Sequence, residues 1–374
     1  MRPAKQYVGQ SAAPPSGRIF VCPRIHSFGG DCLFWLLLVV LLGLLVYGQP
    51  VLAAAGDAAL LWWTRVFPAL LPYLILTGLA VRCRPRLPRL FRLHPYALTS
   101  LLLGAIGGYP VGARVLGEGL AAGALSESDA RRFSLFASLP SPSFLMTVTA
   151  LGLFDCPAAV PVLCAAVYGT ALFVLLLFGF RPSDAAPPAA RTLSASDVTG
   201  AIEDGLSAIL RIGGCIVLCR CLAALLEAAG AMRMLCALLP WDENVIRAAV
   251  IGLLEMTSGT AAAAALPLPL GVRLPLCVFL QMFGGASVLL QIRCFLPVRS
   301  FWKTILGRLG MGICGAVLCA LLMQLLPPAL VPAMASPDEM LHRAARLSTL
   351  VLPTVTGLIS AVLFGIWMSP QAKR

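Results

Sequence analysis

The sequence predicts an all-α fold: a polytopic helical membrane protein with about eight spans, two re-entrant or broken helices and two inverted repeats. Three observations lead to this prediction. Hydrophobic residues make up 59% of the 374-residue chain and charged residues only 12%, about half the charged share of a soluble domain. Mean hydropathy is +0.90. Several apolar runs have the length of a membrane span, and two shorter runs stop at Gly, Pro or hydroxyl residues.

The net charge of +12 does not indicate nucleic-acid binding, because the Arg residues lie between apolar runs instead of forming one basic face. The 13 Cys include no CxxC pair, so we expect neither a metal site nor a cofactor. The three His are far apart in polar segments, and the chain has no HExxH, GxSxG or P-loop motif. An enzyme is therefore not expected.

Eight apolar runs qualify as spans. They cover residues 32–48, 66–81, 142–154, 158–180, 206–226, 274–296, 305–326 and 347–368. Residues 1–31 are a polar tail, and 32–64 hold the first span with a connecting amphipathic segment. A cleaved signal peptide is the alternative for this region, since Ala53-Ala54-Ala55 follows the run. The long basic region and long apolar run favour an uncleaved span.

The third run is short for a span. We expect the preceding helix to extend it, beginning near Ser126, where Ser126 and Asp129 have capping-box spacing.

Two half-length apolar runs predict broken helices. Residues 96–108 run into GGYPVGAR, and residues 248–254 run into EMTSGT. Membrane helices that are interrupted inside the protein have this pattern, because hydrocarbon cannot satisfy the backbone groups freed at a break.

The positive-inside rule then orients the chain. If each interrupted segment enters and leaves on one side, the richer set of Arg and Lys falls on a single side, which we assign to the cytoplasm together with the N-terminus. That set covers residues 1–31, 82–92, 181–200, 293–308 and 373–374.

The Pro/Ala/Ser-rich linker 181–200 divides the chain into two similar halves, 65–180 and 201–328, which are followed by a polar loop and C-terminal span in 329–374. Each half has a span, a break, a Ser- or Gly-rich entry and a closing span. The first half starts outside and the second inside, so the repeats would be inverted. Secondary transporters commonly have this architecture, with a solute site at the repeat interface.

Several segments together resemble a known family. In order they are VFPALLPYLILTGLAV, GGYPVGARVLGEGLAAGALSESDARRF, RIGGCIVL, LLEMTSG and FGGASVLLQ. Over roughly residues 33–330 the chain resembles the YlbJ-type sporulation integral membrane proteins, which carry the nucleoside-recognition, or Gate, domain. The resemblance implies a multi-pass cell-membrane protein of endospore-forming bacteria, needed for sporulation and a candidate transporter. It supplies no substrate.

The sequence departs from that family's pattern at two places. Residues 138–142 read SLPSP where a more polar stretch is expected, and Met282 replaces a Ser before Gly284-Gly285. Both changes make the expected site less polar, which leaves its ligand open.

Glu255 is the sharpest candidate site residue, because a carboxylate at membrane depth is costly unless it is paired or hydrated. It is either a proton or cation site, or a carboxylate that only pairs with an Arg or lies shallow in the membrane interface. Arg211 is the candidate partner; it can pair with Glu255, bind an anionic solute or form a structural ion pair. Arg114 can close the first break by donating to free carbonyls, or bind an anion. The remaining candidates are polar residues at or near the breaks: Tyr109, Thr257, Ser258, Ser141, Ser143 and Ser287.

These residues predict a sporulation-associated transporter or permease of an unknown small polar or anionic solute, embedded in a lipid bilayer. The alternative is a non-transporting scaffold or envelope factor. A cavity holding Glu255 and the GYPVGAR segment favours transport, whereas groups paired off in a dry interior favour the scaffold.

Overall fold

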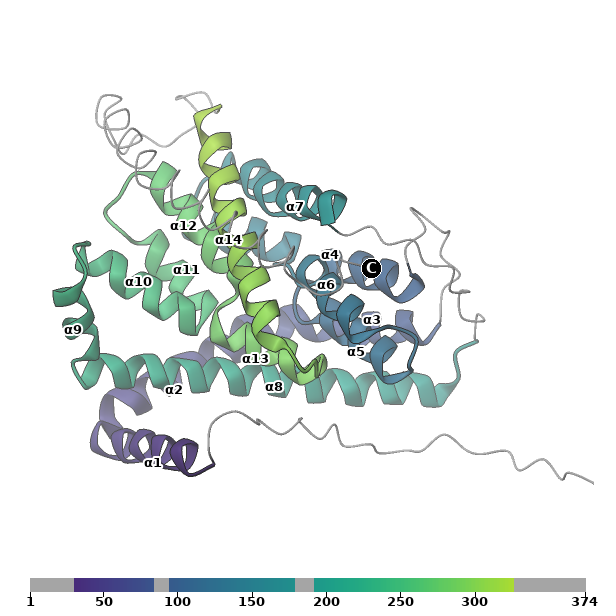
Figure 1. The fold of residues 1–374 in the computed structure, drawn as a ribbon, viewed down its shortest axis with the longest axis horizontal. Helices are drawn as coiled ribbons and strands as arrows, with labels where there is room; N and C mark the ends of the chain where they lie inside the picture. Colours follow the sequence, from purple (N-terminus) through teal and green to yellow (C-terminus); the bar gives the residue numbers. More distant parts are fainter. Residues whose placement is uncertain (1–29, 84–93, 179–191, 326–374) are drawn as a thin grey trace, which may run out of the picture.

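The computed structural model describes residues 30–83, 94–178 and 192–325, and all regular elements in these ranges are helices (Figure 1). The all-α prediction is confirmed for this part of the chain. The predicted polar tail, the C-terminal span 347–368, nearly all of the loop 82–92 and most of the linker 181–200 lie outside the described residues.

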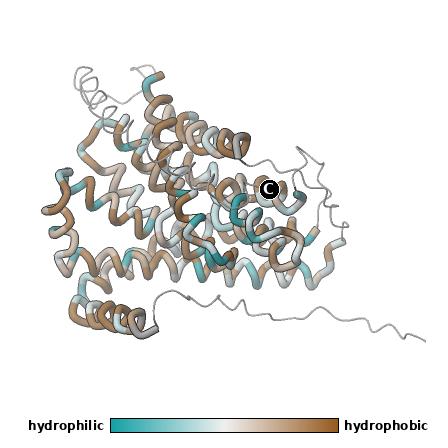
Figure 2. Tube along the Cα trace, viewed as in Figure 1, coloured by the Kyte–Doolittle hydropathy of each residue, from teal (hydrophilic) through white to brown (hydrophobic). Residues whose placement is uncertain are grey.

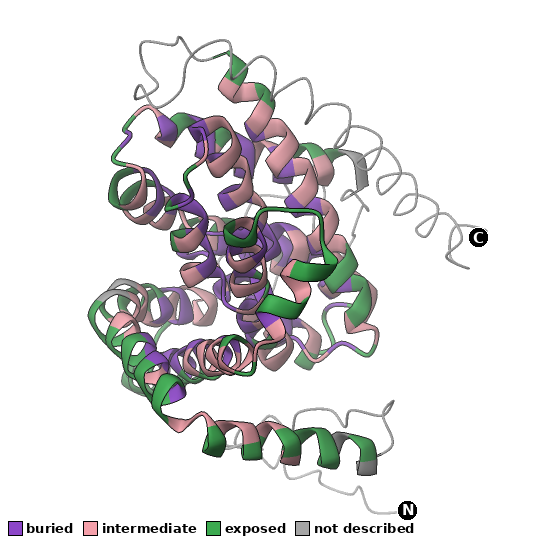
Figure 3. Ribbon diagram, turned by 90° about the vertical axis from the view of Figure 1, so that its left-hand side faces the viewer, coloured by how far each residue is buried: buried purple, intermediate pink, exposed green. Residues whose placement is uncertain are grey.

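The N-terminal helices form an elbow. Helix α1 (Gly30–Val46) and helix α2 (Gly48–Leu61) are bent by 94° at the break between them. Most described α1 side chains are exposed and apolar, and Figures 2 and 3 show α1 as a hydrophobic helix set apart from the rest. Because exposure of so much apolar surface to water is unfavourable, α1 requires lipid around it.

A π-helical turn, η1 (Trp62–Val66), joins the elbow to α3 (Phe67–Arg82). Both α2 and α3 pack along α8 (Ala195–Ala228). Two glycines of α8 allow this close approach: a Cβ at Gly213 would lie 2.6 Å from the Trp62 ring, and one at Gly205 would lie 2.8 Å from Ile75. The Trp62 indole N–H also donates to the Ile209 carbonyl at 3.2 Å.

Helix α8 has 34 residues and begins inside the predicted linker 181–200. Ser194 and Asp197 form a capping box at its start, with the Ser194 amide donating to the Asp197 carboxylate at 2.9 Å. The linker prediction overlooked this S-x-x-D signal, so its last residues belong to the helix.

The first half of the chain contains a broken helix followed by a second interruption. Its elements are α4 (Pro95–Gly107), α5 (Val111–Ala121), α6 (Glu127–Ala137), η3 (Phe144–Leu153) and α7 (Ala159–Phe178). The break between α4 and α5 lies at Gly108, whose φ is +74°, as the GGYPVGAR segment predicts. Ser126 caps α6 as expected, accepting from the Asp129 amide at 3.1 Å.

Helix α6 does not extend the third predicted span. It ends at Ala137, and residues 138–141 are non-helical before the chain turns into η3. Pro140 and Pro142 explain this, because Pro disfavours helical conformation in the residue before it and lacks an amide hydrogen.

The second half has a similar order of elements. After the short α9 (Ala231–Leu238) come α10 (Glu243–Leu254), α11 (Met256–Ala264), α12 (Leu270–Phe283), α13 (Gly285–Phe295) and α14 (Phe301–Gln324). The predicted break at Glu255 separates α10 from α11. The span predicted for 274–296 agrees with a candidate membrane span at Leu270–Phe295. Inside it, Gly284 and Gly285 have φ values of +90° and +65° and separate α12 from α13, an interruption that was not predicted.

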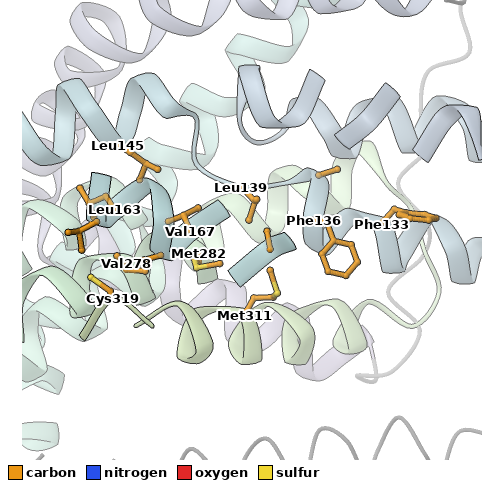
Figure 4. Close-up of a cluster of buried hydrophobic side chains, with 14 of the residues drawn as sticks. Phe133, Phe136, Leu139, Leu145, Leu163, Val167, Val278, Met282, Met311 and Cys319 are labelled. Carbon is orange, nitrogen blue, oxygen red and sulfur yellow. The ribbon is translucent and has the colours of Figure 1, made fainter. Parts of the chain in front are cut away.

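The main hydrophobic core joins the two halves. Side chains of α6 and α7 meet those of α12 and α14 in one buried cluster (Figure 4). The labelled members are Phe133, Phe136, Leu139, Leu145, Leu163, Val167, Val278, Met282, Met311 and Cys319. Because residues far apart in the sequence share this core, the halves form one packed body.

Four described helical segments are long and apolar enough to cross a membrane: the α7 segment Ala159–Leu176, α8, the broken pair α12–α13, and α14. The α1–α2 pair gives a fifth if it counts as one span. The predicted total of eight includes α3 and η3, which are shorter apolar helices, and the undescribed C-terminal run.

Candidate functional site

The two predicted breaks contact each other. The Tyr109 hydroxyl, from the break between α4 and α5, donates to the Met256 sulfur at 3.3 Å. Met256 is the first residue of α11, directly after the break at Glu255. Two helices interrupted at positions about 150 residues apart in the sequence therefore meet inside the fold. We call this place the break junction.

Glu255 caps a helix inside the break junction. Its side chain is 1% exposed, and its two carboxylate oxygens accept from the amides of Thr257 at 2.9 Å and Ser258 at 2.7 Å. These amides are among the free donors at the start of α11, and the positive end of the helix dipole favours a negative charge there. The carboxylate is thus satisfied by the backbone that follows it.

Arg211 does not fill the role of ion-pair partner to Glu255. Its side chain is exposed on α8, and its guanidinium lies over the Phe295 ring, 5.9 Å from the ring centre. The structure therefore does not show the Arg211–Glu255 pair, which was one of the alternatives for Arg211.

Residues 138–141 line the first break. The Tyr109 amide donates to the Leu139 carbonyl at 2.9 Å, and the Tyr168 hydroxyl of α7 donates to the Pro140 carbonyl at 2.7 Å. A Cβ at Gly108 would lie 2.8 Å from the Ser141 amide nitrogen. The interrupted end of α6 thus satisfies backbone groups that hydrocarbon would leave unpaired.

Gly284 and Gly285 lie beside the second break, as residues 138–141 lie beside the first. A Cβ at Gly285 would lie 2.6 Å from the Gly252 carbonyl oxygen near the end of α10. In each half, the break of one helix therefore packs against the interruption of the next.

Arg308 is the residue that the sequence analysis missed. It was counted with the surface cations of segment 293–308, but it lies in α14 and is 1% exposed. Its guanidinium donates to three carbonyls: Phe283 at 2.8 Å, Met282 at 2.7 Å and Ser138 at 2.6 Å. It therefore binds the carboxyl ends of both α12 and α6. The signal in the sequence was an Arg placed within the apolar run ILGRLGMG, where a charge is costly.

Arg114 neither closes the first break nor lies at the junction. Its guanidinium pairs with Asp204 of α8 at 3.1 Å and with Glu118 at 3.4 Å. Asp204 also pairs with Arg82 at 2.8 Å. These four charges form an ion-pair network among α3, α5 and α8, so a structural role explains Arg114.

The predicted hydroxyl residues are distributed over several elements. Thr257 and Ser258 are half-buried at the break junction, and the Ser141 hydroxyl accepts from the Phe144 amide at 3.2 Å. Ser143 precedes η3, and its carbonyl accepts from Thr147. Ser287 is buried in the first turn of α13. The structure thus brings Tyr109, Glu255, Thr257 and Ser258 together.

Among the described residues, no group of three or more His, Cys, Asp or Glu is arranged to hold a metal ion. No disulfide joins the described cysteines. The chemistry visible at the junction is hydrogen bonding by hydroxyl, amide, carboxylate and guanidinium groups.

The apolar exposed helices and the broken helices packed inside them define a helical integral membrane protein. The comparison with known proteins agrees with this class. Over 117 residues the chain is 27% identical to the sporulation integral membrane protein YlbJ of Bacillus subtilis (strain 168). The match spans 29% of each protein, so it bears on less than a third of either. No family model and no solved structure matches the chain.

Proposed function

We propose that the protein is a sporulation-associated transporter of a small polar or anionic solute, with its solute site at the break junction. The contact between Tyr109 and Met256 is the observation that carries this proposal. Helix ends inside a membrane protein present unpaired N–H and C=O groups, and transporters use such ends to bind solutes near the middle of the membrane.

We propose two inverted Gate-like repeats, covering 65–180 and 201–328, and the similar order of elements in the two halves supports a repeat. The first runs α3, α4 with α5, α6 with η3, and α7. The second runs α8, α10 with α11, α12 with α13, and α14. Each is a continuous helix, a broken helix, a second interrupted helix and a closing helix. Rocking of one such repeat against the other would expose the junction alternately to the two sides.

One observation favours the alternative, a non-transporting scaffold or envelope factor. Glu255 is almost completely buried and its carboxylate is already bonded to two amides, as expected of a polar group that only stabilises the fold. The half-buried Thr257 and Ser258 beside it are the polar groups that a solute at the junction would contact, so transport requires that water reaches them.

Substitution at Ser258 tests the transport proposal in cells that lack the gene. We expect Ser258→Leu to fill the junction, and to fail to restore both spore formation and the solute content of sporulating cells, at a normal protein level in the membrane. The same substitution at Ser207, an exposed residue of α8, is the control and restores both. Full restoration by the Ser258 variant contradicts the proposal.

Water access separates transport from the scaffold. A transporter predicts that Ser258→Cys reacts with a membrane-impermeant maleimide, as measured by mass spectrometry of the labelled peptide. Leu210→Cys, on the exposed apolar face of α8, is the lipid-facing control and stays unlabelled. Equal, negligible labelling at both positions favours the scaffold.

A further inference from the structure

We infer that the solute site recognises an anionic group through Arg308. This inference rests on the proposed function and names the chemical class of its solute. Arg308 is distinct from Arg114 and Arg211, the cations that the sequence suggested for this task.

Arg308 belongs to the break junction. Its three carbonyl partners are the last residues of α12 and the residue that follows α6. The Ser138 carbonyl that accepts from Arg308 directly precedes Leu139, whose carbonyl accepts from the Tyr109 amide at the first break. The guanidinium therefore contacts the segment that packs against the tyrosine connecting the two breaks.

The Arg308 guanidinium has N–H groups that do not donate to these carbonyls. A guanidinium carries five N–H groups, and three of them are used on carbonyls. Two N–H groups remain in a region where the side chain is 1% exposed. Buried donors normally have acceptors, so a bound acceptor completes the arrangement.

Among the described residues, the charge of Arg308 also has no counter-ion. The ion pairs among the described residues do not include Arg308, and the Glu255 carboxylate is bonded to the amides of Thr257 and Ser258 instead. The negative end of α12 is offset by the positive end of α13, which begins immediately after it at Gly285. The negative end of α6 balances only part of a full positive charge.

Two further groups at this place suit an anion. The Ser138 hydroxyl oxygen is buried and has no partner among the described residues, while the carbonyl of the same residue bonds to Arg308. The first turn of α13 has no side-chain cap, and a Cβ at Gly284 would lie 3.2 Å from a terminal nitrogen of Arg308. A guanidinium, a hydroxyl and free helix amides form the donor set that binds carboxylates and phosphates.

The test uses the full chain in phosphatidylcholine nanodiscs, with inorganic phosphate, sulfate, acetate and succinate as probes. We expect at least one probe to raise the unfolding temperature of the wild type in a saturable way. In Arg308→Gln the apparent Kd of that probe rises about tenfold or more, because charge-assisted hydrogen bonds are lost. Arg211→Gln removes an exposed cation and leaves the Kd unchanged.

Ser138→Ala covers the case in which Arg308→Gln does not fold, since it removes the unpartnered hydroxyl and keeps the backbone carbonyl. We expect it to raise the Kd about threefold or more, because one hydrogen bond to the anion is lost. The inference is overturned if no probe stabilises the wild type, or if Ser138→Ala and a folded Arg308→Gln bind like the wild type. Stabilisation by phosphatidylglycerol nanodiscs alone also overturns it, because the anion is then a lipid headgroup.

These results are separable from the transport proposal. Absence of anion binding together with maleimide labelling of Ser258→Cys leaves a transporter of a neutral solute. Anion binding without water access at Ser258 leaves an anion-stabilised scaffold.

Discussion

Two buried charges at the break junction act on helix ends of opposite sign. Glu255 accepts from amides at the start of α11, and Arg308 donates to carbonyls at the ends of α6 and α12. Each charge is opposite in sign to the partial charge of the helix end that it contacts, so both contacts are favourable. Single side chains thus satisfy backbone groups that are left free where the helices are interrupted.

Replacement of Glu255 by Ala should destabilise the protein by about 1–3 kcal/mol, because the α11 amides lose a buried acceptor. Glu255→Gln retains one carbonyl oxygen as an acceptor and should reduce the stability less. The measurement is chemical unfolding in detergent, followed by tryptophan fluorescence. If both variants unfold like the wild type, Glu255 does not stabilise the protein by capping α11.

The sequence identified Glu255 as important but not its bonding. A carboxylate followed by Thr and Ser is an N-cap pattern as well as a proton-site pattern, and only coordinates separate the two. Arg308 was missed because a positively charged residue near the end of an apolar run also fits a surface anchor. Its burial depends on α6 and α12, which are distant in the sequence.

The helices themselves are interrupted where small residues allow close contact. Gly104 of α4 and Gly112 of α5 both face the last carbonyl of α6. A Cβ would lie 2.0 Å from the Ala137 carbonyl oxygen at Gly104 and 1.9 Å at Gly112. No side chain fits at such distances, so backbone movement would have to accompany any substitution.

Gly112→Ala should therefore reduce the amount of folded protein in the membrane and lower its unfolding temperature in detergent, at a cost of about 2 kcal/mol or more. Gly214→Ala on α8 is the matched control. A Cβ there meets no atom within 4 Å, and Ala favours the helix by about 1 kcal/mol. Equal amounts of folded protein and equal unfolding temperatures for the two variants would contradict the close packing of α5 on α6.

Breaks marked by Pro or by hydroxyl residues were predictable at this scale, and the break marked by glycine alone was not. The segments at Gly108 and Glu255 stood out because Tyr-Pro and hydroxyl residues follow them. Gly284-Gly285 sits within an unbroken apolar run, and glycine in a membrane helix more often indicates close packing. Only the positive φ values distinguish it as a break.

At the scale of the whole molecule, composition was sufficient to predict a helical membrane protein. The number of spans was not predictable, because hydropathy does not separate a crossing helix from a half-length broken one. The contact between the two breaks also required the fold, since it joins residues of different halves.

Cross-linking tests this long-range arrangement directly. We expect Tyr109→Cys combined with Met256→Cys to give an intramolecular product with a short bis-maleimide in native membranes, because the side chains are in contact. The linked peptides are identified by mass spectrometry, so the native thiols can remain. Tyr109→Cys with Leu45→Cys, which is exposed on α1, is the control. Equal yields for the two pairs contradict the packing of the halves.

The length of α8 fixes where the water boundary falls on the protein. A helix of 34 residues is about 51 Å long, whereas the hydrocarbon layer is about 30 Å thick. A tilt of up to about 40° absorbs only part of the difference, so one end of the rod must project beyond the lipid. The acidic end qualifies, because it carries Asp197, Glu203 and Asp204. The ion-pair network among α3, α5 and α8 then lies at the depth of the lipid headgroups; its members are Arg82, Arg114, Glu118 and Asp204. The membrane depth of every other described residue can be measured from this network.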